Sequence, residues 1–262
     1  MLILWKEFTH SSQITDCPQI ISGKHIAMFD PLSAFIGSSG IRTELETLSS
    51  RCPNQLVPFK FFSQVIYDQF DGTIIRCPLR TTSSTINSRV IAPDDIAYLF
   101  RQFISEELGV TFLFLQSLQH LEIHDVSEEG VSRCLATLSI DRSHNNSAIV
   151  NTFVHSMREQ RNWRVMLCPF EKEEAIALLS QKFTVDPTTI LKEHKLLPSI
   201  GIATVMDRTT QEKASGRLFT YLPLPISTGF PVHLHALFAL TQSRQNLRNA
   251  KEIGVVPGSA DR

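Results

Sequence analysis

Alternating apolar and polar residues predict strands in the first third of the chain and again in its second half. The run KHIAMF at residues 24–29 alternates and ends at Asp30-Pro31, and TIIRCPL at residues 73–79 is β-prone and follows a turn. Further runs typical of strands lie at residues 132–141, 162–170, 201–207, 217–224 and 233–241. The apolar stretch at residues 111–126 could begin as a helix and end as a strand.

The clearest predicted helix begins at Pro93. This proline stands in the first turn beside Asp94 and a second aspartate, where the helix dipole favours negative charge. Its apolar residues recur at spacings of three and four: Ile96, Leu99, Phe100, Phe103 and Leu108. Gly109 is expected to end it. Two more helices are predicted at residues 171–183 and 186–194.

The mixed order of these elements predicts an α+β fold in two units. Charged and polar residues concentrate between residues 125 and 165, so the division between the units is expected there. The segment 222–233, LPLPISTGFPVH, is expected to be a rigid connection between two strands because of its prolines.

Composition is that of an ordinary globular protein. The chain has 262 residues, of which 42% are hydrophobic and 19% charged, with a net charge of -1. This balance favours neither nucleic acid nor a membrane as a partner. The opening MLILWKEF has too few apolar residues for a signal peptide, and no apolar run approaches the length of a membrane span. A soluble, cytoplasmic protein is therefore expected.

The sequence offers no catalytic motif. It contains no G-x-S-x-G, no P-loop and no G-x-G-x-x-G. Its five cysteines are scattered and never form C-x-x-C, which argues against a zinc knuckle and a disulfide framework and favours reduced, partly buried thiols. The acidic pairs Glu106-Glu107 and Glu128-Glu129 are expected to be solvated. No catalytic residue is predicted.

Two pairs of histidines could suggest a metal site. His233 and His235 would share one face of a strand, but no cysteine or acidic residue nearby has a supporting spacing. His120 and His124 have the spacing of two ligands on a helix, yet their surroundings favour a strand and form no H-E-x-x-H motif. A structural role is preferred for both pairs, and no metal ligand is predicted.

Four segments, in the same order, resemble the sacsin/Nov family. They are QITDCPQIISGKHIAMFDP (13–31), GTIIRCPLRT (72–81), LFRQFISEELGVTFLFLQSLQHLEI (99–123) and GRLFTYLPLPISTGFPVHLHALFALTQSRQNL (216–247). Together they span nearly the whole chain. Four ordered matches are much more specific than any one of them.

The resemblance implies a fold. Sacsin-type modules are similar to the nucleotide-binding domain of the ninety-kilodalton heat-shock chaperone, a two-layer α/β sandwich shared with gyrase and histidine kinases (the Bergerat type). By this analogy residues 1–125 are the C-terminal part of an ATPase-type domain, and residues 126–262 are a unit resembling a chaperone middle domain, possibly incomplete. Residues 24–29 and 73–79 would be neighbouring strands.

The resemblance also implies that this sequence lacks most of the family's ATP-binding elements. In the family, a helix with Glu and Asn, a D-x-G-x-G turn and a Gly-rich lid precede these segments, and this chain begins after them. Only Gly72 and Thr73 correspond to the nucleotide pocket, and alone they cannot hold a triphosphate with its magnesium. No cofactor is therefore expected. ATP with magnesium is expected to bind only if the missing N-terminal part is supplied.

Two hypotheses follow for function. The first is a sacsin-like, chaperone-related protein or fragment without ATPase activity, which binds protein partners or itself in protein quality control. The alternative is a functional chaperone-type ATPase whose N-terminal half is missing from this chain. A truncated sandwich is also expected to leave uncovered the sheet face that carries Ile26, Met28, Ile74 or their neighbours.

Overall fold

The computed structural model describes most of the chain. The described residues are 13–62, 69–143, 146–169, 171, 173–174, 177, 199–206, 215–238, 240–241 and 247. The chain forms two compact units, Met1–Arg101 and Gln102–Arg262. The architecture is α+β and rich in sheet, which confirms the predicted fold class.

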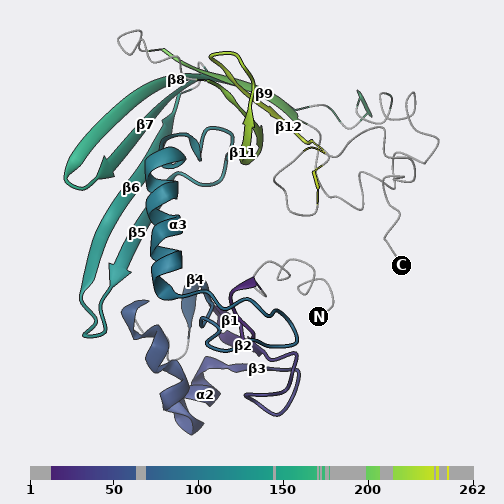
Figure 1. The fold of residues 1–262 in the computed structure, drawn as a ribbon, viewed down its shortest axis with the longest axis vertical. Coiled ribbons are helices and arrows are strands. Elements are labelled where there is room, and N and C mark those ends of the chain that lie inside the picture. Colours follow the sequence, from purple (N-terminus) through teal and green to yellow (C-terminus); the bar gives the residue numbers. More distant parts are fainter. Residues whose placement is uncertain are drawn as a thin grey trace. The chain divides into compact units, whose positions relative to one another are not determined.

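The first unit contains a four-stranded antiparallel sheet in the order β3-β2-β1-β4 (Figure 1). Its strands are β1 (Gln19–Gly23), β2 (His25–Phe29), β3 (Gly40–Glu44) and β4 (Phe70–Arg76). The two strands predicted from the sequence alternation are present as β2 and β4. They are not neighbours, because β1 lies between them and pairs with both. That prediction of adjacency was wrong.

One face of this sheet is covered by helix. Ile21, Ile26 and Ile74 are buried in a cluster with residues of α2 (Leu45–Arg51) and of the 3-10 helix η2 (Pro53–Phe62). The helical members of the cluster are Leu45, Leu56 and Phe59. The face expected to be bare therefore has its cover within the described residues. On the opposite face, the side chain of Ile75 is 57% exposed.

Helix α3 (Pro93–Glu106) begins at the predicted residue but ends three residues before Gly109, which lies with Leu108 in a 3-10 helix that follows. Asp94 and Asp95 occupy its first turn, and the Ala92 N–H donates to the Asp95 carboxylate at 3.0 Å. The division between the two units falls inside this helix, after Arg101. The predicted limit at residues 125 and 126 lies further along, within β5 (His120–Val126). As a description of domains within the family, that limit stays a prediction.

The second unit is built on an eight-stranded sheet in the order β11-β10-β12-β9-β8-β7-β6-β5 (Figure 1). After β5, its strands are β6 (Ser132–Arg142), β7 (Ser147–Val154), β8 (Met157–Pro169), β9 (Ser199–Val205), β10 (Arg217–Thr220), β11 (Leu222–Ser227) and β12 (His233–Ala236). Neighbouring strands are antiparallel except β10 and β12, which run parallel.

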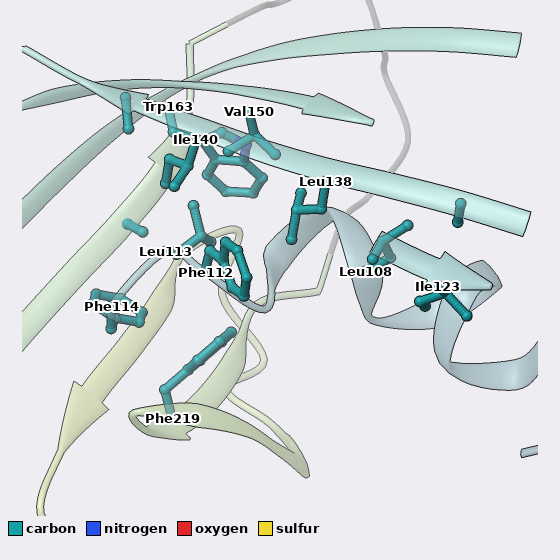
Figure 2. Packing of buried hydrophobic residues seen from close by; sticks show 13 residues of the cluster. Leu108, Phe112, Leu113, Phe114, Ile123, Leu138, Ile140, Val150, Trp163 and Phe219 are labelled. Atoms are coloured by element: carbon teal, nitrogen blue, oxygen red, sulfur yellow. The ribbon is translucent and has the colours of Figure 1, made fainter. Parts of the chain in front are cut away.

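The core of the second unit lies on the inner face of this sheet. Residues 108–114, including the 3-10 helix η3 (Leu108–Val110), lay Leu108, Phe112, Leu113 and Phe114 against the strands (Figure 2). Leu138, Val150, Trp163 and Phe219 meet them from β6, β7, β8 and β10. Residues 111–114 form turns and not the helix that the start of this stretch could have been, while its end is strand β5.

Two further expectations need correction. Strand β7 was not predicted, because a polar segment precedes it and its apolar run is short. The segment LPLPISTGFPVH is only partly a connection, since its first six residues form β11 and only residues 228–232 link β11 to β12. The predicted helices at 171–183 and 186–194 lie outside the described residues, apart from a few positions in the first.

Candidate functional site

The predicted nucleotide-pocket residues lie at the start of β4. Gly72 has a φ of 141°, a conformation that favours glycine, and Thr73 follows it on an exposed part of the strand. The Thr73 hydroxyl lies 3.0 Å from the Ser22 hydroxyl on the neighbouring strand, and Ser22 Oγ donates to the Gly72 carbonyl at 3.3 Å. Thr73 thus has a cross-strand partner in the sheet itself.

A cavity of about 550 Å³ lies on the other face of the same sheet. Ile26, Met28, Ile41 and Thr43 line it from β2 and β3. Because Ile26 and Ile74 are both paired with Ile21, they share a face, and Thr73 next to Ile74 points the opposite way. The cavity and the predicted pocket residues are therefore separated by the thickness of the sheet.

An ion pair anchors one wall of the cavity. The guanidinium of Arg80, whose side chain is 2% exposed, binds the Asp16 carboxylate with Nε at 2.9 Å and Nη2 at 2.5 Å. The Arg80 Nη1 donates to the Gln13 and Arg89 carbonyls, and Ser84 Oγ donates to Asp16. Hydrogen bonds from Arg80 hold the pKa of Asp16 below its ordinary value. The guanidinium of Arg80 thus donates from all three of its nitrogens, as a buried charge requires.

A second buried carboxylate shapes the loop that carries Phe35. Asp30 is fully buried and accepts backbone N–H groups from Ala34 at 3.1 Å, Phe35 at 2.6 Å and Ile36 at 2.8 Å. Burial alone would raise the pKa of Asp30, but these backbone hydrogen bonds outweigh it and lower the pKa. The loop is thereby fixed with Phe35 and Ile36 on the cavity wall.

The cavity lining contains two cysteines, Cys17 and Cys52. Burial, together with the nearby charge of Asp30, raises the pKa of the Cys17 thiol. A raised pKa keeps Cys17 protonated at neutral pH, which does not suit a nucleophile. The described cysteines are all free thiols. Cys17 contributes a small, weakly polar surface to the cavity.

His233 and His235 do share one face of β12, as the sequence predicts, and it is the inner face. The Arg217 N–H donates to His233 Nδ1 at 3.0 Å, and the Tyr221 N–H donates to His235 Nδ1 at 3.2 Å. Burial lowers the pKa of His233 to about 4 and lowers that of His235 too. Both rings are therefore neutral at pH 7 and connect β12 to the chain around β10.

Aromatic contacts complete the setting of these rings. His235 stacks on Phe114 with centroids 5.1 Å apart, and His233 meets Phe219 edge-on at 5.2 Å. Ser199 Oγ lies 3.1 Å from His235 Nε2, but both residues are buried and Nδ1 is already an acceptor. A ring that accepts at Nδ1 carries its proton on Nε2, so it cannot take the serine proton. This pair is structural.

His120 and His124 lie on strand β5 rather than on a helix. Both bind the carboxylate of Glu122, with Nε2 of His120 at 3.0 Å and Nε2 of His124 at 2.8 Å from its oxygens. These hydrogen bonds, that from His120 first, lower the pKa of Glu122. Across the described residues, no group of three or more His, Cys, Asp or Glu side chains is arranged to hold a metal ion.

The sequence does not predict the cavity, although several of its lining residues lie in the segments that resemble the family. Asp16 belongs to the segment 13–31 and Arg80 to the segment 72–81, far apart in the chain. A charge in each of two apolar segments was the available signal. Its meaning depends on pairing that only the folded chain shows.

No described helix is long and apolar enough to cross a membrane.

Comparison with known proteins agrees with the resemblance. Residues 8–136 match the family described as Sacsin domain. Human sacsin is 27% identical over 288 aligned residues, which cover 92% of this chain and 6% of sacsin. The matched range includes the whole described part of the first unit and ends within β6 of the second.

Proposed function

Because this chain is a sacsin-like protein, we propose that it is a chaperone-related module that acts by binding other polypeptides, in cytoplasmic protein quality control, without hydrolysing ATP. The chain spans 6% of human sacsin, so the activities of such a long protein are not transferred to it. The observation that carries the proposal is the cavity beneath the four-stranded sheet.

The lining of the cavity suits an uncharged, apolar occupant. Its charged side chains are Asp16 and Arg80, and they neutralise each other. Much of the remaining surface is apolar, with Met28, Leu48 and Leu79 among the lining residues. A phosphate group would require unpaired hydrogen-bond donors or a cation. An apolar side chain requires neither, because its burial away from water is favourable in itself.

The position of the cavity beside a sheet edge favours a polypeptide. β3 is an outermost strand of the four-stranded sheet, and its Ile41 and Thr43 point into the cavity. An extended peptide can pair with such an edge and place alternate side chains into a neighbouring pocket. Phe35 and Ile41 line the cavity while 69% and 47% exposed, so they would meet the peptide first.

The test is binding of a permanently unfolded polypeptide, reduced and carboxymethylated α-lactalbumin, measured by fluorescence anisotropy. The double variant Phe35→Ser, Ile41→Thr should weaken binding about thirtyfold, since each change removes roughly 1 kcal/mol of apolar burial. Ile75→Thr is the matched control, because Ile75 is 57% exposed, between Phe35 and Ile41, and lies on the opposite face. Equal binding by all three proteins would refute the cavity as the site.

The alternative function is ATP binding at Gly72 and Thr73, and one observation favours it: this end of β4 is exposed. Titration calorimetry with Mg-ATP distinguishes the two. The proposal expects no saturable heat at micromolar ATP. Micromolar binding that Thr73→Val abolishes would support the ATPase and reject the proposal of a module without ATPase activity.

A further inference from the structure

The eight-stranded sheet carries an apolar surface on the face opposite its core. We name it the outer apolar patch, and it comprises Met166, Cys168, Ile200, Ile202, Leu218, Leu234 and Ala236. Strand register places Met166, Ile202 and Leu234 side by side across β8, β9 and β12, with Leu218 of β10 next to Leu234. Cys168, Ile200 and Ala236 form a second row.

These side chains point away from the core. Along β9, Ala203 is buried on the inner face, while Ile200 and Ile202 are 50% and 39% exposed. Met166 on β8 is 44% exposed and alternates with Val165 and Leu167, which pack on the core. These strands are thus apolar on both faces, a pattern typical of sheets that are covered on both sides.

The outer face of β6 is different. On β6, the outward residues Thr137, Ser139 and Asp141 are polar and alternate with the buried Leu138 and Ile140. This is the pattern of a sheet face that meets water.

The outer face of β7 also carries Ile149 and Phe153, which are 38% and 42% exposed. They pair with the polar Asn162 and Arg158 of β8, so polar residues separate them from Met166. The continuous apolar surface is therefore the one around β9, and its occupant should be found near those strands.

The geometry points to an occupant within the chain: we propose that the segment 170–198 packs on the outer apolar patch through an amphipathic helix at 171–183. The segment leaves β8 after Pro169 and re-enters β9 at Ser199, and these two residues are paired neighbours. The next pair along the strands, Cys168 and Ile200, already belongs to the patch. The segment therefore starts and ends at the border of the surface it would cover.

The sequence of the segment fits that surface. Glu173, Glu174 and Ala177 are described as helical and exposed, and at 100° per residue they share one side of a helix. In a helix continued over 171–183, Ile176, Leu179 and Phe183 would fall on the opposite side. A helix over 171–183 would be about 20 Å long, and four strands span about 14 Å, so one helix can cross the patch.

Cysteine crosslinking tests the contact directly. With Cys17, Cys52, Cys77 and Cys134 replaced by serine, Cys168 remains as a probe inside the patch. Leu179→Cys should form an intramolecular disulfide with Cys168 under mild oxidation, detected by peptide mass spectrometry. Glu174→Cys, on the polar side of the same helix, is the matched control and should crosslink at least tenfold more slowly. Equal rates, or a product that joins two chains, would overturn the proposal.

Hydrogen exchange gives a second readout that does not depend on introduced cysteines. Ile202→Gln should raise amide exchange rates in 171–183 about tenfold or more, because the helix loses its apolar support. Thr204→Gln lies on the same strand and face, outside the patch, and should leave those rates unchanged. Unchanged exchange in Ile202→Gln, with the sheet itself still protected, would refute the contact.

Discussion

Acidification should destabilise the second unit through His233. Its pKa is about 4 in the folded chain and 6.5 in an exposed state, so the unfolded chain binds the proton more readily. The stabilisation from the neutral ring is complete above pH 6.5 and is lost as the pH falls towards 4. Burial is the main cause and the positive charge of Arg217 adds to it. A difference of about 2.5 pKa units corresponds to about 3 kcal/mol.

The measurement is urea unfolding at pH 7.5 and pH 4.5, followed by the fluorescence of Trp163, whose ring lies 5.4 Å from that of His233. Trp5→Phe removes the other tryptophan signal. His233→Gln is the control, because its amide oxygen can still accept the Arg217 N–H but does not titrate. The parent should lose about 2.5 kcal/mol more than this variant at pH 4.5. Equal losses in both proteins would refute the assignment of a buried, neutral His233.

Three further predictions concern single positions. Asp16→Asn should lower the free energy of unfolding by about 3 kcal/mol, because Arg80 would stay buried without its counter-charge. Asp125→Asn, in the exposed pair with Arg133, should change the free energy of unfolding by less than about 0.5 kcal/mol, and urea titration compares the two variants. Gly216→Ala should lower the free energy of unfolding by on the order of 3 kcal/mol, since the new methyl would overlap the Val232 carbonyl. In Gly109→Ala the new methyl meets nothing within 4 Å, so this variant should keep the stability of the parent; melting temperatures compare the two variants. The double change of His233 and His235 to Gln should leave zinc content at background by elemental analysis, and stoichiometric zinc lost in the variant would contradict the structural role.

Local patterns predicted much of the secondary structure. The alternation in residues 24–29 and the proline and aspartates at the start of α3 act within a few residues, so β2 and α3 could be recognised. The neighbour relation of β2 and β4 could not, because QIISG at residues 19–23 lacks alternation and still forms the central strand β1. Strand order depends on pairing between distant segments.

The candidate site shows the same limit. Gly72 and Thr73 were recognised by resemblance, and the structure places them on an exposed face with Ser22 as partner. The cavity combines residues from the loops at 15–17, 35–36 and 78–82 with residues of β1, β2, β3 and α2. No residue spacing in the sequence predicts this cavity, since its walls come from segments that contact one another only in the folded chain.

The prolines of β11 have a consequence for the behaviour of this sheet towards other chains. β11 is outermost among the described strands, and Pro223 and Pro225 alternate with its other residues. Neither position has an N–H, so a strand laid along this edge would lack two of the hydrogen bonds that a continuous ladder needs. Fibril growth requires an edge that serves repeatedly as a template. At the β11 end, the two missing N–H groups therefore oppose such growth.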